Sequence, residues 1–324
     1  MKILKRLLLL SFIGTLIGGV FLYQIYNLIH TPYTLNTRTE ITIPKGSGLN
    51  QTARLLEENR IIKDQRLFIL YARLNKIASN LKAGEYLFEG NLSIPDIAQK
   101  LVKGDVINRS LTIPEGKALV EILALINQNP HLTGEITIPL KEGDILPETY
   151  IFSKGTSKDE IIQKAKLAMT NALDTAYKNL SPDSPIKTKE ELLTLASIVE
   201  KETGLANERP LVASVFLNRL RLGMLLQTDP TVIYAITHGK MDLNRPIYKK
   251  DLKYDSPYNT YLYKGLPPTP ICSPGVASIN SVVSPATSKY LYFVADGITG
   301  GHRFATSLSE HNKNVSSYRR NIKK

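Results

Sequence analysis

Early in the C-terminal half of the chain lies the stretch LLTLASIVEKETG, residues 192–204. Thr188 precedes it, with a glutamate three residues further on, and this spacing of a capping box predicts that a helix begins there. At about 100° per residue, Glu202 lies about 20° from Leu195, within the apolar face of that helix. The same arithmetic places Glu200 about 140° from Leu195, on the flank of the helix.

A glutamate on a buried helix face needs an explanation. Desolvation raises the pKa of a carboxyl group, which then keeps its proton near neutral pH, as a general acid must. The alternative is that the helix ends near Gly204 and that Glu202 emerges into water at the last turn. Periodicity leaves both open, so Glu202 is the first candidate for an acid and Glu200 the second.

Composition indicates a folded protein without a metal centre. The 324 residues are enough for about two domains, and 43% hydrophobic with 22% charged residues are ordinary values for a globular chain. A single cysteine, Cys272, excludes an intramolecular disulfide and a multi-thiolate cluster. The five histidines are too widely spaced for a short ligand motif. We therefore expect neither a metal nor a cofactor.

The N-terminus has the pattern of a membrane anchor. Residues 1–6 carry Lys2, Lys5 and Arg6, and residues 7–29 follow without a charged side chain. At about 1.5 Å per residue this segment covers the roughly 30 Å of a hydrocarbon layer. A cleaved signal peptide is the competing interpretation, but no alanine occurs before Ala53 to form its cleavage site. We expect an uncleaved transmembrane helix.

Charge sets the expected orientation and partners. The basic residues before the span place residues 1–6 in the cytoplasm and the rest of the chain outside, by the positive-inside rule. The net charge of +12 draws the protein to polyanions. Outside the cytoplasm nucleic acid is a poor partner, and an anionic bacterial cell wall is a better one.

The region after the anchor predicts a small α/β module. Residues 30–38 are polar and indicate a stalk. From residue 39 to 110 the pattern is strand, helix, helix, strand and a further short helix, the arrangement of a LysM-like carbohydrate-binding module or of generic α+β packing. The opening phrase ITIPKG, residues 41–46, recurs as LTIPEG at 111–116 and as ITIP at 136–139, each time suggesting a strand that ends at proline.

The remaining residues, 111–324, predict a larger mixed α+β domain, so that the expected fold class is α+β throughout. A long helix over 158–180 precedes the stretch described first. Downstream, Asp229 stands before a proline, as an N-cap does. Loops dense in tyrosine, amide and proline residues are suited to binding sugars. The candidate substrate-binding residues taken from this region are Gln227, Thr228, Asp229, Tyr258, Asn259 and His302.

Several motifs together resemble the endolytic murein transglycosylase family (MltG, YceG-like). They are ASIVEKET at 196–203, NRL at 218–220, QTDPTVIY at 227–234, YNTY at 258–261, GLPP at 265–268, and YFVADG at 292–297 followed by Gly301-His302 and His311-Asn312. The resemblance extends over essentially the whole chain. One departure is the sequence LPETY at 146–150, where the family has an aromatic-rich version.

The resemblance implies a bacterial inner-membrane lyase that cuts nascent peptidoglycan strands internally. Such an enzyme cleaves the bond between N-acetylmuramic acid and N-acetylglucosamine, leaves 1,6-anhydro ends and terminates glycan elongation. The essential glutamate of the family carries over to Glu202, with Glu200 as the runner-up. Glycan strands, the membrane and peptidoglycan synthases are the implied partners.

Two other functions remain open at this point. A hydrolytic muramidase needs a second carboxylate, and Glu208 and Asp229 have surface or capping explanations. A membrane-tethered scaffold would bind peptidoglycan without cleaving it.

Overall fold

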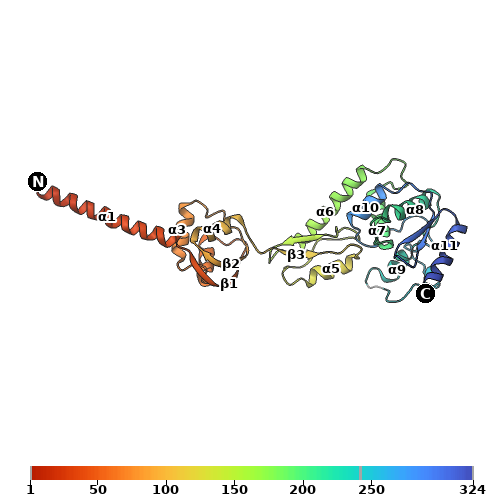
Figure 1. Cartoon of the computed structure of the whole chain (residues 1–324), viewed down its shortest axis with the longest axis horizontal. Coiled ribbons are helices and arrows are strands. Elements are labelled where there is room, and N and C mark those ends of the chain that lie inside the picture. The colour runs from red at the N-terminus through yellow and green to blue at the C-terminus, as the bar shows by residue number, and fades with distance from the viewer. Residues whose placement is uncertain (1, 241–242, 323–324) are drawn as a thin grey trace. The chain divides into compact units, whose positions relative to one another are not determined.

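The computed structural model describes residues 2–240 and 243–322 and is a mixed α+β protein, as expected. Figure 1 shows its helices and strands. The chain divides into two compact units, which are described separately. The N-terminal unit comprises residues 1–109 together with 153–155, and the C-terminal unit comprises 110–152 and 156–324.

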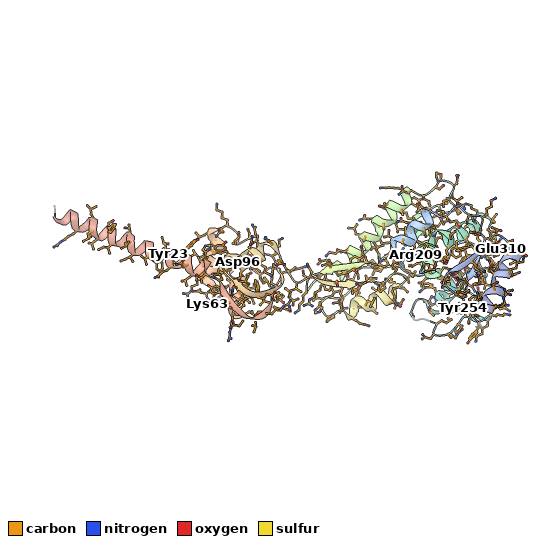
Figure 2. All side chains as sticks on the ribbon, viewed as in Figure 1. Tyr23, Lys63, Asp96, Arg209, Tyr254 and Glu310 are labelled. Atoms are coloured by element: carbon orange, nitrogen blue, oxygen red, sulfur yellow. The ribbon has the colours of Figure 1, made fainter. Side chains whose placement is uncertain are left out.

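Helix α1, Lys2–His30, contains the apolar segment. The part from Leu8 to His30 is 23 residues long, and its most apolar stretch of 18 residues has a mean hydropathy of 1.9 and no buried residue. Tyr23 extends from it into open space (Figure 2) and is 65% exposed. By length and composition, this helix is suited to crossing a membrane once.

The predicted stalk is wrong. Helix α1 continues to His30, and Ile29 at its end is buried in the core of the N-terminal unit. Strand β1 begins at Tyr33. Polar composition suggested a loose connection, but the exposed face of an edge strand has the same composition, because only alternate side chains face the core.

The order strand, helix, helix, strand is confirmed in the N-terminal unit. Strands β1, Tyr33–Ile43, and β2, Gly84–Leu92, pair in antiparallel fashion. Between them in the sequence lie α2, Leu49–Glu58, and α3, Gln65–Leu74, and α4, Ile94–Lys103, follows. Their apolar faces enclose a core whose largest fully buried side chains include Tyr86, Phe68, Phe88, Leu56, Ile97 and Leu101.

A buried carboxylate holds two cations in this unit. Glu85 has only 4% of its side chain exposed, and its Oε2 atom lies 2.6 Å from Nη2 of Arg109. Its Oε1 atom lies 3.1 Å from Nζ of Lys154. Burial raises the pKa of Glu85, but hydrogen bonds and the charges of both cations outweigh this effect and lower it overall.

Because the partners differ in exposure, we predict an asymmetric response to mutation. The double variant Arg109→Ala with Lys154→Ala leaves the buried charge of Glu85 without either cation and should destabilise the N-terminal unit by about 3 kcal/mol. Glu85→Ala leaves two cations that reach water and should cost only about 1 kcal/mol. Hydrogen exchange of the β1 and β2 amides measures both. Equal costs for the two variants would contradict this account.

The C-terminal unit begins with a small layer of mixed structure. Strands β3, Arg109–Thr112, and β4, Thr149–Phe152, pair, and helices α5, Leu119–Gln128, and α6, Lys158–Lys178, pack beside them. The strand expected at 136–139 is absent from the described structure, in which these residues form an irregular segment. Asp159 accepts the backbone hydrogen bond of Thr137 there, in place of a strand partner.

Helix α7, Lys189–Glu202, is the centre of the C-terminal unit (Figure 1). The capping box of Thr188 and Glu191 is confirmed. Around it pack α6, α8, Arg209–Arg221, α9, Asp229–Thr237, and α10, Val276–Val283. All eight residues from 192 to 199 are buried, so the helix is enclosed by the protein on every side.

The remaining elements are a 3-10 helix, a β-hairpin and the last helix. A short 3-10 helix, Asp251–Lys253, lies in the loop after α9. Strands β5, Tyr292–Ala295, and β6, His302–Ala305, form an antiparallel hairpin. Helix α11, Leu308–Asn321, packs on both strands.

Candidate active site

Glu202 is the last residue of α7 and lies at a cavity of about 440 Å³ in the C-terminal unit. The helix ends where the sequence allowed, but Glu202 does not emerge into bulk water: its side chain is half-buried. The residues that line the cavity with it come from α8, α9, the loop before α9, the loop after the 3-10 helix, β5 and α11. They are Arg219, Leu226, Gln227, Asp229, Tyr261, Tyr292, Phe293, Val294, Leu308, His311 and Val315.

Burial raises the pKa of Glu202 to about 7. The hydrogen bond from Thr228 lowers it, the negative charge of Asp229 raises it, and the charges of His302 and Arg219 lower it. Desolvation is the largest of these effects, and it raises the pKa because the charged form of a carboxyl group loses more than the neutral form on leaving water. Near neutral pH this carboxyl group therefore retains a proton that it can donate.

Thr228 fixes the orientation of the acid. Its Oγ1 atom donates a hydrogen bond to Oε1 of Glu202, and its backbone N–H donates to Oγ1 of Thr260 at 3.1 Å. Thr228, and not Asp229 as expected, is the N-cap residue of α9. Because Oε1 accepts from Thr228, the acid proton of Glu202 is left to Oε2.

Gln227 lies beside Thr228 in an unusual backbone conformation. Its φ angle is +52°, in the left-handed region that non-glycine residues rarely adopt. Its backbone N–H donates to the carbonyl oxygen of Thr260 at 3.1 Å, which holds it in this conformation. Strained backbone of this kind is concentrated at functional sites, and the side chain of Gln227 lines the cavity.

A stack of three side chains forms another part of the cavity wall. The guanidinium carbon of Arg219 lies 5.2 Å from the ring centre of Tyr292, and the His311 ring stacks on Tyr292 at 5.2 Å between ring centres. Arg219 also donates from Nε to the carbonyl oxygen of Leu291 at 2.6 Å and from Nη1 to that of Leu226 at 2.8 Å. Arg219 thereby joins α8 to β5 and to the loop that carries Gln227.

His302 lies near Glu202 and forms a pair with Glu208. Its Nδ1 atom is 2.7 Å from Oε2 of Glu208, and its backbone N–H donates to Oε1 at 2.8 Å. Glu208 also accepts from Thr203, the C-cap residue of α7, at 3.4 Å. This cluster fixes the end of α7, and His302 contributes charge near Glu202 without lining the cavity.

Glu200, the second candidate acid, is engaged elsewhere. Its Oε1 atom lies 3.3 Å from Nη2 of Arg209, its Oε2 atom accepts from the backbone N–H of Gly275 at 2.9 Å, and 6% of its side chain is exposed. Glu200 is therefore buried, although the helical wheel placed it on the flank of the helix. The two glutamates are distinguished by their partners and by the cavity, and both features favour Glu202.

The structure divides the expected substrate-binding residues into three groups. Gln227 and Asp229 line the cavity, while Thr228 and His302 act on Glu202. Tyr258 and Asn259 lie outside the cavity lining. Asn259 is fully buried and donates to the carbonyl oxygens of Leu252 in the 3-10 helix, at 3.1 Å, and of Tyr254 just after it, at 2.8 Å. The Tyr258 hydroxyl lies 2.8 Å from that of Thr269.

Sequence reasoning missed Arg219, Tyr261, Tyr292 and His311 as parts of the site. Each of them lies inside a motif that carries the family resemblance, so those motifs could have identified them as site residues. Arg219, although charged, is only 8% exposed because α8 is surrounded by protein. Among residues 2–240 and 243–322, no group of three His, Cys, Asp or Glu side chains is arranged to hold a metal ion.

Comparison with known proteins settles the family. The model of the YceG-like family matches residues 41–317, most of the chain. The chain belongs to the YceG-like family. An endolytic murein transglycosylase from Bacillus subtilis is 35% identical over 94% of this chain and 91% of its own length. One from Streptococcus pneumoniae is 32% identical over 93% of this chain, which spans 62% of that relative.

A solved structure agrees with the fold. The crystal structure of a yceG-like protein from Listeria monocytogenes is 33% identical in sequence and superposes with a TM-score of 0.53. The match covers 86% of this chain and 99% of that one.

The raised pKa of Glu202 predicts a dependence of stability on pH. The unfolded chain releases this proton near pH 4.5 and the folded chain near pH 7, so Glu202 costs stability progressively as pH rises between these values. Glu202→Gln removes the cost and should unfold like wild type below about pH 4 but be more stable by about 1–3 kcal/mol at pH 8. Urea unfolding at both pH values measures this. A variant less stable than wild type at pH 8 would contradict a buried, protonated carboxyl group.

Proposed function

We propose that this chain is a lytic transglycosylase that cuts the glycan strands of peptidoglycan internally. The observation that carries the proposal is a single protonated carboxyl group, Glu202, at a cavity lined by aromatic, amide and cationic side chains. Relatives that match nearly the whole chain are named endolytic murein transglycosylases, which supports the same activity.

The reaction follows from what one acid can do. Oε2 of Glu202 donates its proton to the oxygen that joins C1 of N-acetylmuramic acid to N-acetylglucosamine, and the C1–O bond breaks. The Glu202 carboxylate then removes the proton of the C6 hydroxyl of the same muramic acid, and O6 bonds to C1. The product carries a 1,6-anhydro end, and the acid is restored. An intramolecular nucleophile avoids the entropy cost of positioning water.

Side chains around the acid provide the rest of the chemistry. The aromatic rings of Tyr261 and Tyr292 offer faces for sugar rings, and Gln227 offers an amide for hydroxyl or acetamido groups. Thr228 keeps Glu202 aimed into the cavity during both proton transfers. A reaction that needs the acid proton should slow as pH rises through about 7.

The apolar helix α1 indicates where in the cell the enzyme acts. We propose that α1 crosses the cytoplasmic membrane of a bacterium with residues 1–6 inside, so that both folded units lie outside, where glycan strands are made. Cleavage near the membrane would terminate elongation of nascent strands, with peptidoglycan synthases as neighbours.

We predict that Glu202→Gln lowers the release of glycan fragments by about 10³-fold, because an amide donates no proton to the leaving oxygen. The matched control is Glu200→Gln, which keeps an acceptor for Gly275 and should stay within about tenfold of wild type. Purified full-length chain in detergent is incubated with sacculi, and products are analysed by mass spectrometry.

The ends of the products decide between the candidate functions. Anhydro-muramic ends support the lyase, whereas reducing muramic ends would make the enzyme a hydrolase, an alternative that gains weight from Asp229 in the same cavity. Binding to sacculi without any release of fragments would make the chain a scaffold.

A further inference from the structure

A second carboxylate shares the cavity with Glu202. Asp229 was expected to cap α9, but Thr228 is the N-cap residue and Asp229 is the first residue of the helix. Its side chain lines the cavity, and its Oδ1 atom accepts a hydrogen bond of 2.6 Å from the hydroxyl of Tyr261, which also lines the cavity. The capping explanation for this residue therefore does not apply.

The backbone on both sides of this hydrogen bond is fixed by a buried network. Thr260, next to Tyr261, is 2% exposed, and its carbonyl oxygen accepts the backbone N–H of Gln227. Its Oγ1 atom accepts the backbone N–H of Thr228 at 3.1 Å and lies 2.8 Å from that of Thr231, which is fully buried. These three contacts of Thr260 fix the backbone on both sides, so that Asp229 and Tyr261 are held in register.

The charges around the cavity suit an ionised Asp229 and a protonated Glu202. The start of a helix favours a negative side chain, and Asp229 stands at the start of α9. Its charge raises the pKa of Glu202, while Arg219 on α8 and His302 on β6 oppose it. The negative charge of Asp229 therefore favours the protonated form of Glu202.

We propose that Asp229, positioned by Tyr261, is a second functional carboxylate of this site, which stabilises positive charge on the sugar ring as the glycosidic bond breaks. This inference rests on the proposed function. Asp229 forms no bond and gains no proton in the cycle. The proton leaves Glu202 for the bridging oxygen and returns to Glu202 from the C6 hydroxyl, while the ionised Asp229 acts through its charge.

The chain contains a matched control for the test. In the same loop, the Tyr263 hydroxyl donates to Oδ1 of Asp255, also at 2.6 Å, but this pair is exposed and does not line the cavity. Asp255→Asn and Tyr263→Phe therefore repeat the chemical changes of Asp229→Asn and Tyr261→Phe outside the site.

The experiment measures kcat and its pH dependence for the full-length chain in detergent on purified glycan strands. Asp229→Asn should lower kcat by about 10²-fold, the size of effect that follows loss of one transition-state-stabilising group. It should also move the alkaline limb of the profile to lower pH by about half a unit or more, because Glu202 then loses its proton more readily. Tyr261→Phe should lower kcat by about tenfold, because Asp229 loses the hydrogen bond that positions it. It should leave the alkaline limb of the pH profile in place, because Asp229 keeps its charge. Both control variants should match wild type.

Two outcomes would overturn the inference. Circular dichroism first establishes that Asp229→Asn is folded. If this variant then has the same kcat and the same alkaline limb of its pH profile as Asp255→Asn, Asp229 is only structural. Asp229→Ser is the second variant if Asp229→Asn does not fold. If wild type releases reducing ends, Asp229 acts as the base or nucleophile of a hydrolase, and the proposed function fails as well. Anhydro ends with an unaffected Asp229→Asn would refute this inference alone.

Discussion

The site depends on the meeting of the end of α7 with the start of α9, where the hydroxyl of Thr228 donates to Glu202. This contact orients the carboxyl group of Glu202 and leaves its proton to Oε2, while burial raises its pKa. The neighbouring structure maintains the contact: Glu208 holds the C-cap residue of α7, and Thr260 holds the backbone before α9. A carboxyl group free to swing into solvent would ionise near its ordinary pKa and lose its use as an acid at neutral pH.

The sequence predicted much of the framework because local signals were strong there. The capping box at Thr188, the long helix α6 and the strand, helix, helix, strand order of the N-terminal unit all depend on interactions within a few residues. The apolar α1 was evident from composition alone. Where a segment forms structure only through distant partners, as at residues 33–38 and 136–139, polar composition and an alternating pattern both misled.

The candidate acid was found for a reason that is only partly correct. The helical wheel assumed that α7 has one buried face, but the helix is enclosed, and Glu200 on the supposed flank is as well covered as the core. Tertiary structure distinguishes the two glutamates, since Glu200 forms an ion pair with Arg209 and Glu202 lines the cavity. The roles of Asp229, Tyr258 and Asn259 were equally beyond periodicity, because each depends on hydrogen bonds that the irregular loops between helices bring together.

The central claim is that the Glu202 carboxyl group is protonated near neutral pH. Infrared difference spectroscopy of the full-length chain, titrated from pH 4 to 9 with Glu202→Gln as the subtracted reference, observes this carboxyl group directly. The account predicts a protonated carboxyl band that disappears with a midpoint near pH 7. A midpoint near 4.5, that of an ordinary glutamate, would contradict it.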